Sequence, residues 1–210
     1  MNNSANLLHS LIEKMNDEPT SGQALGILAD MAGIIESAAE KEYTPIDTLD
    51  CYLYLGHHYY YYKHYMFALT YYDKALIALE QCAGSIAADD ELRRELEECF
   101  VNMFDMYKKM DKEKEAKELA AFIKKIMPSL LEAVKKARRS HLKNDPVEYT
   151  EAYMAILPEL ELKIDAELQG VNRGHGFCFQ RWHTKAEILK RDYGIEWDSP
   201  GVLNPHVRFD

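Results

Sequence analysis

Apolar residues recur at intervals of three and four along most of this chain, which is the spacing of one face of an α-helix. No alternating strand pattern competes with it. Turn-forming residues separate the periodic segments, so the pattern predicts helices joined by short loops. The expected helices span residues 4–16, 21–41, 45–63, 65–82, 88–110, 112–126, 128–143, 146–156, 158–169 and 178–193. The predicted fold class is all-α.

Local chemistry marks several of these boundaries. Thr44 and Asp145 each stand directly before a proline, the order expected of an N-cap followed by proline at the first helical position. Pro158 falls inside a periodic stretch, where it kinks or restarts a helix. Gly194 follows the last periodic residue and is the expected C-cap of the final helix.

One segment carries a more specific spacing. Gly56 and Ala68 are small residues placed where two antiparallel helices approach closely, and larger apolar residues around them fill the seam. The full register is Tyr52, Leu55, Gly56, Tyr59, Ala68, Tyr72 and Ala75. A weaker copy follows at Phe100, Met103, Phe104, Tyr107, Ala116, Ala120 and Pro128. A degenerate copy precedes it at Leu8, Leu11, Ile12, Met15, Ala24, Leu28 and Met31.

Through these three copies, residues 5–128 resemble tetratricopeptide (TPR) repeats. The resemblance implies stacked antiparallel helix pairs in a right-handed superhelical array, with a concave face that binds ligands. Extra residues between the copies, notably 84–90, imply an irregular array. We expect a TPR-like domain over residues 1–170 and a C-terminal capping segment, 171–210, packed on the same domain.

The segment from Gly170 onwards differs in composition from the repeats. It is rich in glycine and proline, yet it contains both tryptophans, Trp182 and Trp197, which makes it too aromatic for a disordered tail. We therefore expect a loop-rich aromatic cap with one further helix.

Composition narrows the class of partner. The formal net charge is −10, and residues 1–100 hold 6 basic and 17 acidic side chains. This acidic half argues against nucleic acid as a ligand.

The four cysteines show no CxxC spacing and are expected to fill the core. No apolar run reaches the roughly 20 residues that cross a bilayer, and the N-terminus lacks a signal peptide, so we expect a cytoplasmic protein without a membrane partner.

The repeat register indicates a tyrosine-rich binding surface. Ten of the 14 tyrosines lie between residues 43 and 72, and a rigid ring with a polar tip suits an interface. The predicted partner-binding residues are Tyr54, His57, Tyr60, Tyr61, Asn102 and Asp105. The alternative is that the tyrosines simply pack between repeats. In the TPR clamps that hold a terminal carboxylate, the corresponding positions are Leu53, His57 and Asn102, of which only Asn102 agrees. Because Glu98 and Asp105 would repel an anion, a basic or apolar partner segment is expected.

Two other clusters have weaker signals. The basic run Lys135, Lys136, Arg138, Arg139 and Lys143 fits a solvated helix face better than a nucleic-acid site. The segment with His175, Cys178, Arg181 and His183 offers a different class of site, for an enzyme or a small-ligand sensor. Its spacing matches no known zinc pattern, and no metal is expected there.

No phosphate-binding glycine loop, serine nucleophile elbow or HExxH motif occurs, and no cofactor is expected. The sequence therefore favours a non-catalytic protein- or peptide-binding module. The C-terminal ligand site is the alternative, and self-association stays open.

Overall fold

The computed structural model describes residues 3–39, 42–88, 90–137 and 142–209, and every element in those ranges is helical. The chain divides into two compact units. Unit 1 comprises Met1–Lys14 and Ile27–Ser140, and unit 2 comprises Met15–Gly26 and His141–Asp210. The boundary expected at residue 170 does not coincide with this division, because residues 141–170 belong with the C-terminal segment. The all-α class is confirmed for the described residues.

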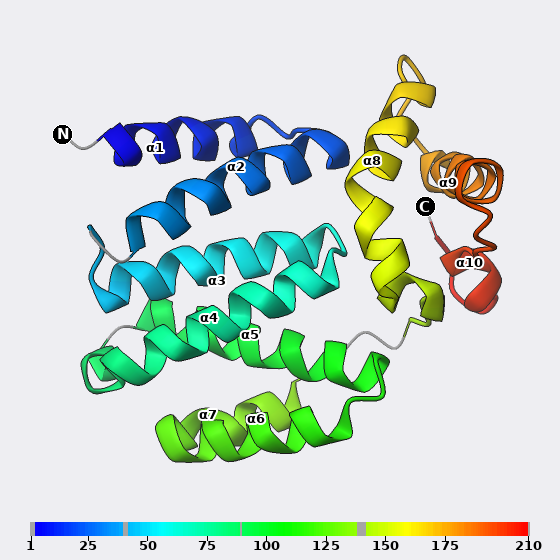
Figure 1. Cartoon of the computed structure of the whole chain (residues 1–210). Helices are drawn as coiled ribbons and strands as arrows, with labels where there is room; N and C mark the ends of the chain where they lie inside the picture. Colours follow the sequence, from blue (N-terminus) through cyan, green and yellow to red (C-terminus); the bar gives the residue numbers. More distant parts are fainter. Residues whose placement is uncertain (1–2, 40–41, 89, 138–141, 210) are drawn as a thin grey trace. The chain divides into compact units, whose positions relative to one another are not determined.

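Unit 1 is a stack of helices in which α3, α4, α5 and α6 run antiparallel to their neighbours in the chain (Figure 1). Its elements are α1 (Asn3–Asn16) as far as Lys14, α2 (Ser21–Ala39) from Ile27, α3 (Pro45–Tyr61), α4 (Tyr65–Cys82), the 3-10 helix η1 (Ala83–Ala88), α5 (Asp90–Lys109), α6 (Glu113–Ile126) and α7 (Pro128–Lys136). Helix α3 packs against both α4 and α5. The core of unit 1 forms where these helices face one another, around side chains such as Leu53, Tyr72 and Phe100, which are fully buried.

The start of α3 shows how local chemistry sets a helix boundary. The Asp47 amide donates to the Thr44 hydroxyl at 3.2 Å, and the Thr44 amide donates to the Asp47 carboxylate at 3.0 Å. This reciprocal capping box satisfies donors that the first turn would otherwise leave unpaired. The N-cap predicted at Thr44 is confirmed.

The α3–α4 seam depends on one glycine. A Cβ placed on Gly56 would lie 2.4 Å from Cδ1 of Tyr72, so any larger residue would collide with this ring. Ala68 on the facing helix is fully buried, as are Leu55 and Tyr72. Small residues therefore let the two backbones approach, as the spacing of the first repeat-like register predicts.

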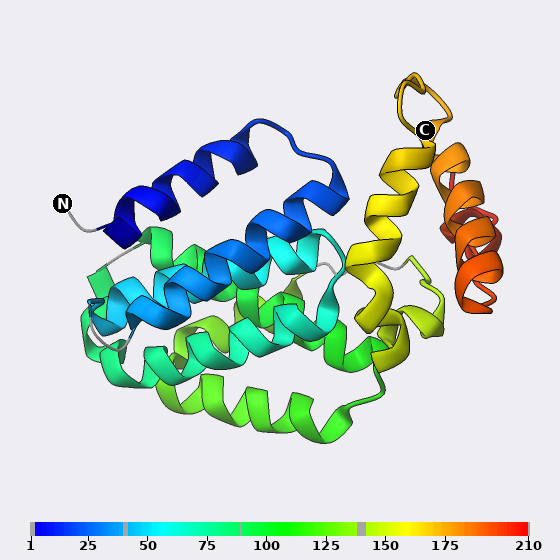
Figure 2. The ribbon, with the colours of Figure 1, turned by 45° about the horizontal axis from the view of Figure 1, so that its top comes forward.

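Unit 2 is built on α8 (Glu151–Glu167), with α9 (Phe177–Tyr193) alongside it (Figure 2). Its other elements are η2 (Pro146–Tyr149), α10 (Pro200–Leu203) and residues Met15–Gly26. Helix α9 ends at Gly194, whose φ of 65° is the left-handed conformation that favours glycine. The C-cap predicted at Gly194 is confirmed.

Unit 2 contains one buried ionic cluster and one that is partly buried. The Lys185 ammonium donates to Glu148 at 2.7 Å, and the Trp197 indole donates to the same carboxylate oxygen at 2.9 Å. Arg181 binds the carboxylate of Glu161 and also donates to the Ser21 hydroxyl at 3.1 Å. Each of these charges thus has an opposite charge beside it, which offsets its loss of hydration.

Three helix predictions need correction. The helix expected over 128–143 ends at Lys136, because Ala137 has an extended backbone with ψ of 134°. The helix expected to begin at Pro146 is only the short 3-10 helix η2, although Asp145 does cap it. The two helices expected on either side of Pro158 are one continuous helix, α8, which Thr150 caps.

Candidate ligand-binding groove

Unit 1 contains a cavity of about 740 Å³ that side chains from α1, α2, α3 and α5 line together. We call it the unit 1 groove. Its lining consists of Leu8, Ile12, Met31, Ile35, Ile46, Asp47, Asp50, Cys51, Tyr54, His57, His58, Glu91, Leu92, Glu95 and Glu98. This volume lies within the range of cavities that hold small ligands or anchoring side chains.

One wall of the groove is apolar. Met31 and Ile35 of α2 form its buried part, with 1% exposed surface each, whereas Leu8 and Ile12 of α1 are only half-buried. Adjacent to them on α1, Leu7 is 50% exposed. The apolar side of α1 is therefore incompletely covered within the described part of the chain, although water is an unfavourable neighbour for aliphatic groups.

The facing wall is acidic. Glu91, Glu95 and Glu98 recur at the four- and three-residue spacing that places them on one side of α5, and Asp50 adds a carboxylate from α3. Asp47 also lines the groove, but its carboxylate is held by the Thr44 cap, which lowers its pKa. The described lining includes five carboxylates and neither lysine nor arginine. The groove therefore attracts cations and repels anions.

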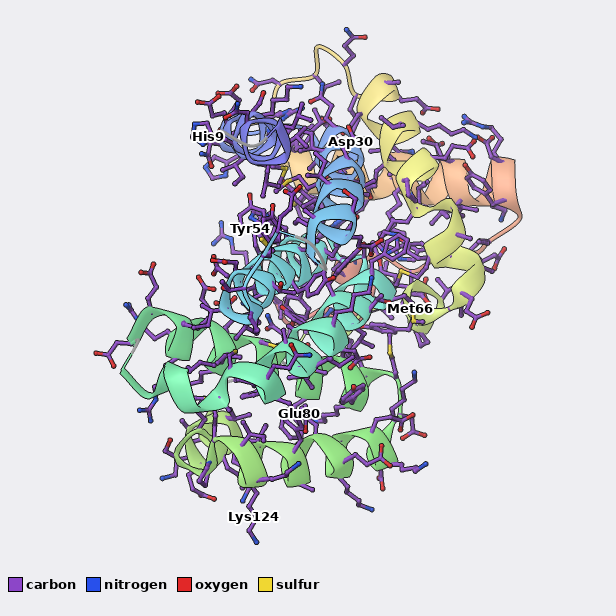
Figure 3. All side chains as sticks on the ribbon, turned by 60° about the vertical axis from the view of Figure 1, so that its left-hand side comes forward. His9, Asp30, Tyr54, Met66, Glu80 and Lys124 are labelled. Carbon is purple, nitrogen blue, oxygen red and sulfur yellow. The ribbon has the colours of Figure 1, made fainter. Side chains whose placement is uncertain are left out.

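Tyr54 and two histidines lie between these walls on α3. Tyr54, labelled in Figure 3, projects from the side of α3 on which α1 lies, and its ring centre is 4.2 Å from that of His58. Burial lowers the pKa of His57 below its ordinary 6.5, against the opposing attraction of Glu98, whose carboxylate is 3.8 Å from Nδ1. Burial also lowers the pKa of His58, and the neighbouring His57 adds to this effect. Both rings are therefore neutral near pH 7.

A hydrogen-bonded network through Tyr72 and Asn102 holds His57 in place. Asn102 donates to the Tyr72 hydroxyl at 3.0 Å, and that hydroxyl lies 2.8 Å from Nδ1 of His57. Because the Tyr72 hydroxyl receives the amide proton, it can donate its own proton to His57. The network links α3, α4 and α5 and holds the histidine ring in one orientation.

The predicted partner-binding residues divide into two groups. Tyr54 and His57 line the groove. Asn102 is buried and committed to Tyr72, while Asp105 accepts from Tyr60 at 3.0 Å and pairs with Lys109 at 2.7 Å. Asn102, Asp105 and Tyr60 are therefore engaged in bonds between the helices of unit 1 rather than in the groove lining. The sequence pattern alone did not distinguish these two groups of residues.

Tyr61 belongs to neither group. It is 75% exposed at the C-terminal end of α3, where its ring meets that of Tyr62 edge-on, and it does not line the groove. The expectation that it shares one surface with Tyr54 is not supported by this geometry.

The sequence pattern did not predict most of the groove lining. The sequence pattern places Leu8, Ile12 and Met31 in the degenerate repeat register, and of the acidic wall on α5 it singles out only Glu98. The spacing of Glu91, Glu95 and Glu98 was the available signal, but charges at helical spacing usually mark a solvated face. Only the approach of α1, α3 and α5 in space turns them into one lining.

The lining includes one cysteine, Cys51. Burial raises the pKa of the Cys51 thiol to about 11, with Asp50 and Asp47 adding to the shift, so the reactive thiolate is scarce at neutral pH. Among the described residues of the whole chain, no group of three or more His, Cys, Asp or Glu side chains could hold a metal ion.

The alternative site in unit 2 is dispersed. Arg181 is engaged by Glu161, Asp165 and Ser21. His183 follows two positions later on α9, about 200° around the helix, and its 76% exposed side chain lies 3.4 Å from Glu187. A single pocket cannot use Arg181 and His183 together in this arrangement.

His175 and Cys178 complete that predicted set. His175 is exposed in the loop before α9, and Cys178 is half-buried in the first turn. All four cysteines of the chain, including Cys178, are free thiols.

The predicted basic run is described only in part. Lys135 and Lys136 are exposed at the end of α7, where Lys135 pairs with Glu132 at 2.9 Å. Arg138 and Arg139 lie outside the described residues. Lys143 belongs to unit 2, where its amide donates to Asn204 at 2.7 Å.

Comparison with family models, with curated proteins and with solved structures finds no match to this chain. None of the helices in the described ranges combines the length and apolar character that crossing a membrane requires.

Proposed function

We propose that unit 1 is a non-catalytic module that binds a segment of another protein in its groove. The observation that carries this proposal is the asymmetry of the lining, in which half-buried aliphatic side chains of α1 face a row of carboxylates on α5. An aliphatic surface left open to a cavity gains free energy when an apolar partner covers it.

The resemblance of residues 5–128 to TPR repeats supports this proposal. The first helix of each expected pair, α1, α3 and α5, contributes to the groove, together with Met31 and Ile35 of α2. In TPR proteins the first helices of successive repeats form the concave face that holds peptides. The close contact at Gly56 within the α3–α4 pair is of the kind that such repeats use.

Charge complementarity defines the partner further. Five carboxylates would repel nucleic acid and acidic peptides, whereas lysine or arginine side chains would gain from this field. We propose a partner segment that is basic or apolar, bound with Tyr54 as an aromatic anchor.

A peptide-display selection against the full chain tests the site. Selected peptides should bind the Tyr54→Ala and Ile12→Asp variants at least tenfold more weakly than the wild type, because both positions line the groove. Tyr61→Ala and Ile77→Asp are matched controls, since Tyr61 and Ile77 are 75% and 62% exposed and neither lines the groove. Their affinities should stay within twofold of the wild type.

Equal affinity for all four variants would overturn the proposal. Light scattering after size-exclusion chromatography distinguishes a further outcome. If the chain alone forms a dimer that Ile12→Asp dissociates, the groove is occupied by a second copy rather than by a different protein.

A further inference from the structure

We infer that the segment bound in the unit 1 groove is an amphipathic α-helix, with lysine or arginine on the side that faces α5 and aliphatic residues on the side that faces α1. This inference rests on the proposed function and adds the conformation and orientation of the partner.

The first argument is the supply of hydrogen-bond donors. An extended peptide presents unpaired backbone carbonyls along its length, and these need donors from the host. The described lining contains no Asn, Gln, Ser, Thr, Lys or Arg, so side-chain donors are limited to Cys51, Tyr54, His57 and His58. A helical guest satisfies its own backbone and needs only side-chain contacts.

The second argument is the spacing of the walls. Leu8 and Ile12 on α1 are four residues apart, and Glu91 and Glu95 on α5 are also four apart, so both walls present rows of side chains with helical periodicity. Side chains on an incoming helix recur at the same interval and can fit between them. This helix-in-groove mode of recognition uses apolar anchors at three- and four-residue spacing.

The third argument is the separation of character between the walls. The lining residues of α1 and α2 are all apolar, whereas all five carboxylates come from α3 and α5, which also contribute Ile46 and Leu92. Glu98 is 66% exposed on its side chain, so it can meet a guest cation without a large loss of hydration. A helix with a uniformly basic or uniformly apolar surface would match one wall and oppose the other.

Synthetic peptides of 18 residues test the inference on the full chain by fluorescence anisotropy. One contains Leu and Lys in a helical amphipathic pattern, a second has the same composition in strict alternation, and a third replaces Lys by Glu in the helical pattern. The first peptide should bind at least tenfold more tightly than the other two, and added salt should weaken its binding. Equal or tighter binding of the alternating or acidic peptide would overturn the inference.

Charge-reversal variants locate the binding. Glu95→Lys with Glu98→Lys should weaken binding of the amphipathic basic peptide at least tenfold. Glu113→Lys with Glu118→Lys is the matched control on α6, where both side chains are more than 60% exposed, and it should change affinity less than twofold. Equal effects of the two double variants would mean that the peptide senses only net charge, and the inference would be wrong.

The display selection separates failure of this inference from failure of the proposed function. Selected peptides that map to the groove but contain internal prolines or acidic side chains would overturn the helical basic partner alone. Selected peptides that ignore the groove variants would overturn both.

Discussion

Substituting Gly56 by alanine tests whether close packing of α3 on α4 supports the groove. The added methyl group would lie 2.4 Å and 2.5 Å from two ring carbons of Tyr72, far inside van der Waals contact. Tyr72 has no exposed surface, and its hydroxyl is bonded to His57 and Asn102. The ring therefore cannot move aside without disturbing the network behind the groove.

The expected cost follows from three contributions. Forcing a methyl group into a filled core costs about 1–3 kcal/mol. Straining the hydrogen bonds of Tyr72 adds about 1 kcal/mol. Replacing glycine by alanine inside a helix stabilises the helix by about 1 kcal/mol. The last two contributions cancel, so Gly56→Ala should lower the free energy of unfolding by about 1–3 kcal/mol.

Urea denaturation followed by far-UV circular dichroism measures this change. Gly33→Ala is the matched control, because Gly33 lies inside α2 with nothing within 4 Å of its Cβ position. It should stabilise the protein by up to about 1 kcal/mol. Combining Gly56→Ala with Tyr72→Leu should cost at least about 1 kcal/mol less than the sum of the single changes, because the smaller side chain makes room for the methyl group. If Gly56→Ala proves as stable as Gly33→Ala, the packing argument is wrong.

Two further predictions concern buried ionisable groups. His64 is 2% exposed, and burial lowers its pKa from 6.5 to about 4, so its contribution to stability is complete above pH 6.5 and is lost as the pH falls toward 4. Between pH 7.5 and 4.5 the free energy of unfolding of the wild type should fall by about 2–3 kcal/mol more than that of His64→Gln. Urea denaturation measures this difference, with a substitution of the exposed His9, His9→Gln, as the control. Equal decreases in the wild type and His64→Gln would refute the assignment. Burial disfavours the charged form of Lys185, but its contacts with Tyr153 and Glu148 raise its pKa overall. Lys185→Met should leave the buried Glu148 carboxylate without its cation and lower the free energy of unfolding by about 3–5 kcal/mol. Tryptophan fluorescence should show that transition at lower urea, whereas Arg191→Met, on the exposed end of α9, should change it little; a wild-type midpoint for Lys185→Met would contradict the ion-pair argument.

The local sequence was sufficient to predict helix caps whose interacting atoms lie within one or two helical turns of each other. The capping box at Thr44 and the C-cap at Gly194 depend on neighbours a few residues away, so their chemistry could be predicted. The close approach at Gly56 was also predictable, because a repeat-like register fixes which residues of two consecutive helices meet. The all-α class follows from the same short-range periodicity.

Helix continuity was decided by contacts beyond that range. Pro158 removes one backbone donor, and its local effect predicts a break. Leu157 and Leu160 on either side of it are buried in unit 2, and this packing supports a continuous α8. Asp145 and Pro146 carry the signature of a long helix, yet Thr150 starts α8 instead.

The candidate site depended most strongly on tertiary structure. Whether a polar residue on α5 faces the groove or the core cannot be told from its spacing, and Asn102 and Asp105 face inward because Tyr72, Tyr60 and Lys109 bind them. The sequence similarly suggests a ligand-binding role for Arg181, whereas in the structure its guanidinium binds Glu161, 20 positions away. The sequence by itself determined that the chain is helical and which faces of its helical segments are apolar, because those properties are local. Only the tertiary structure decided which faces are covered by another helix and which, along α1 and α5, are left to line a groove.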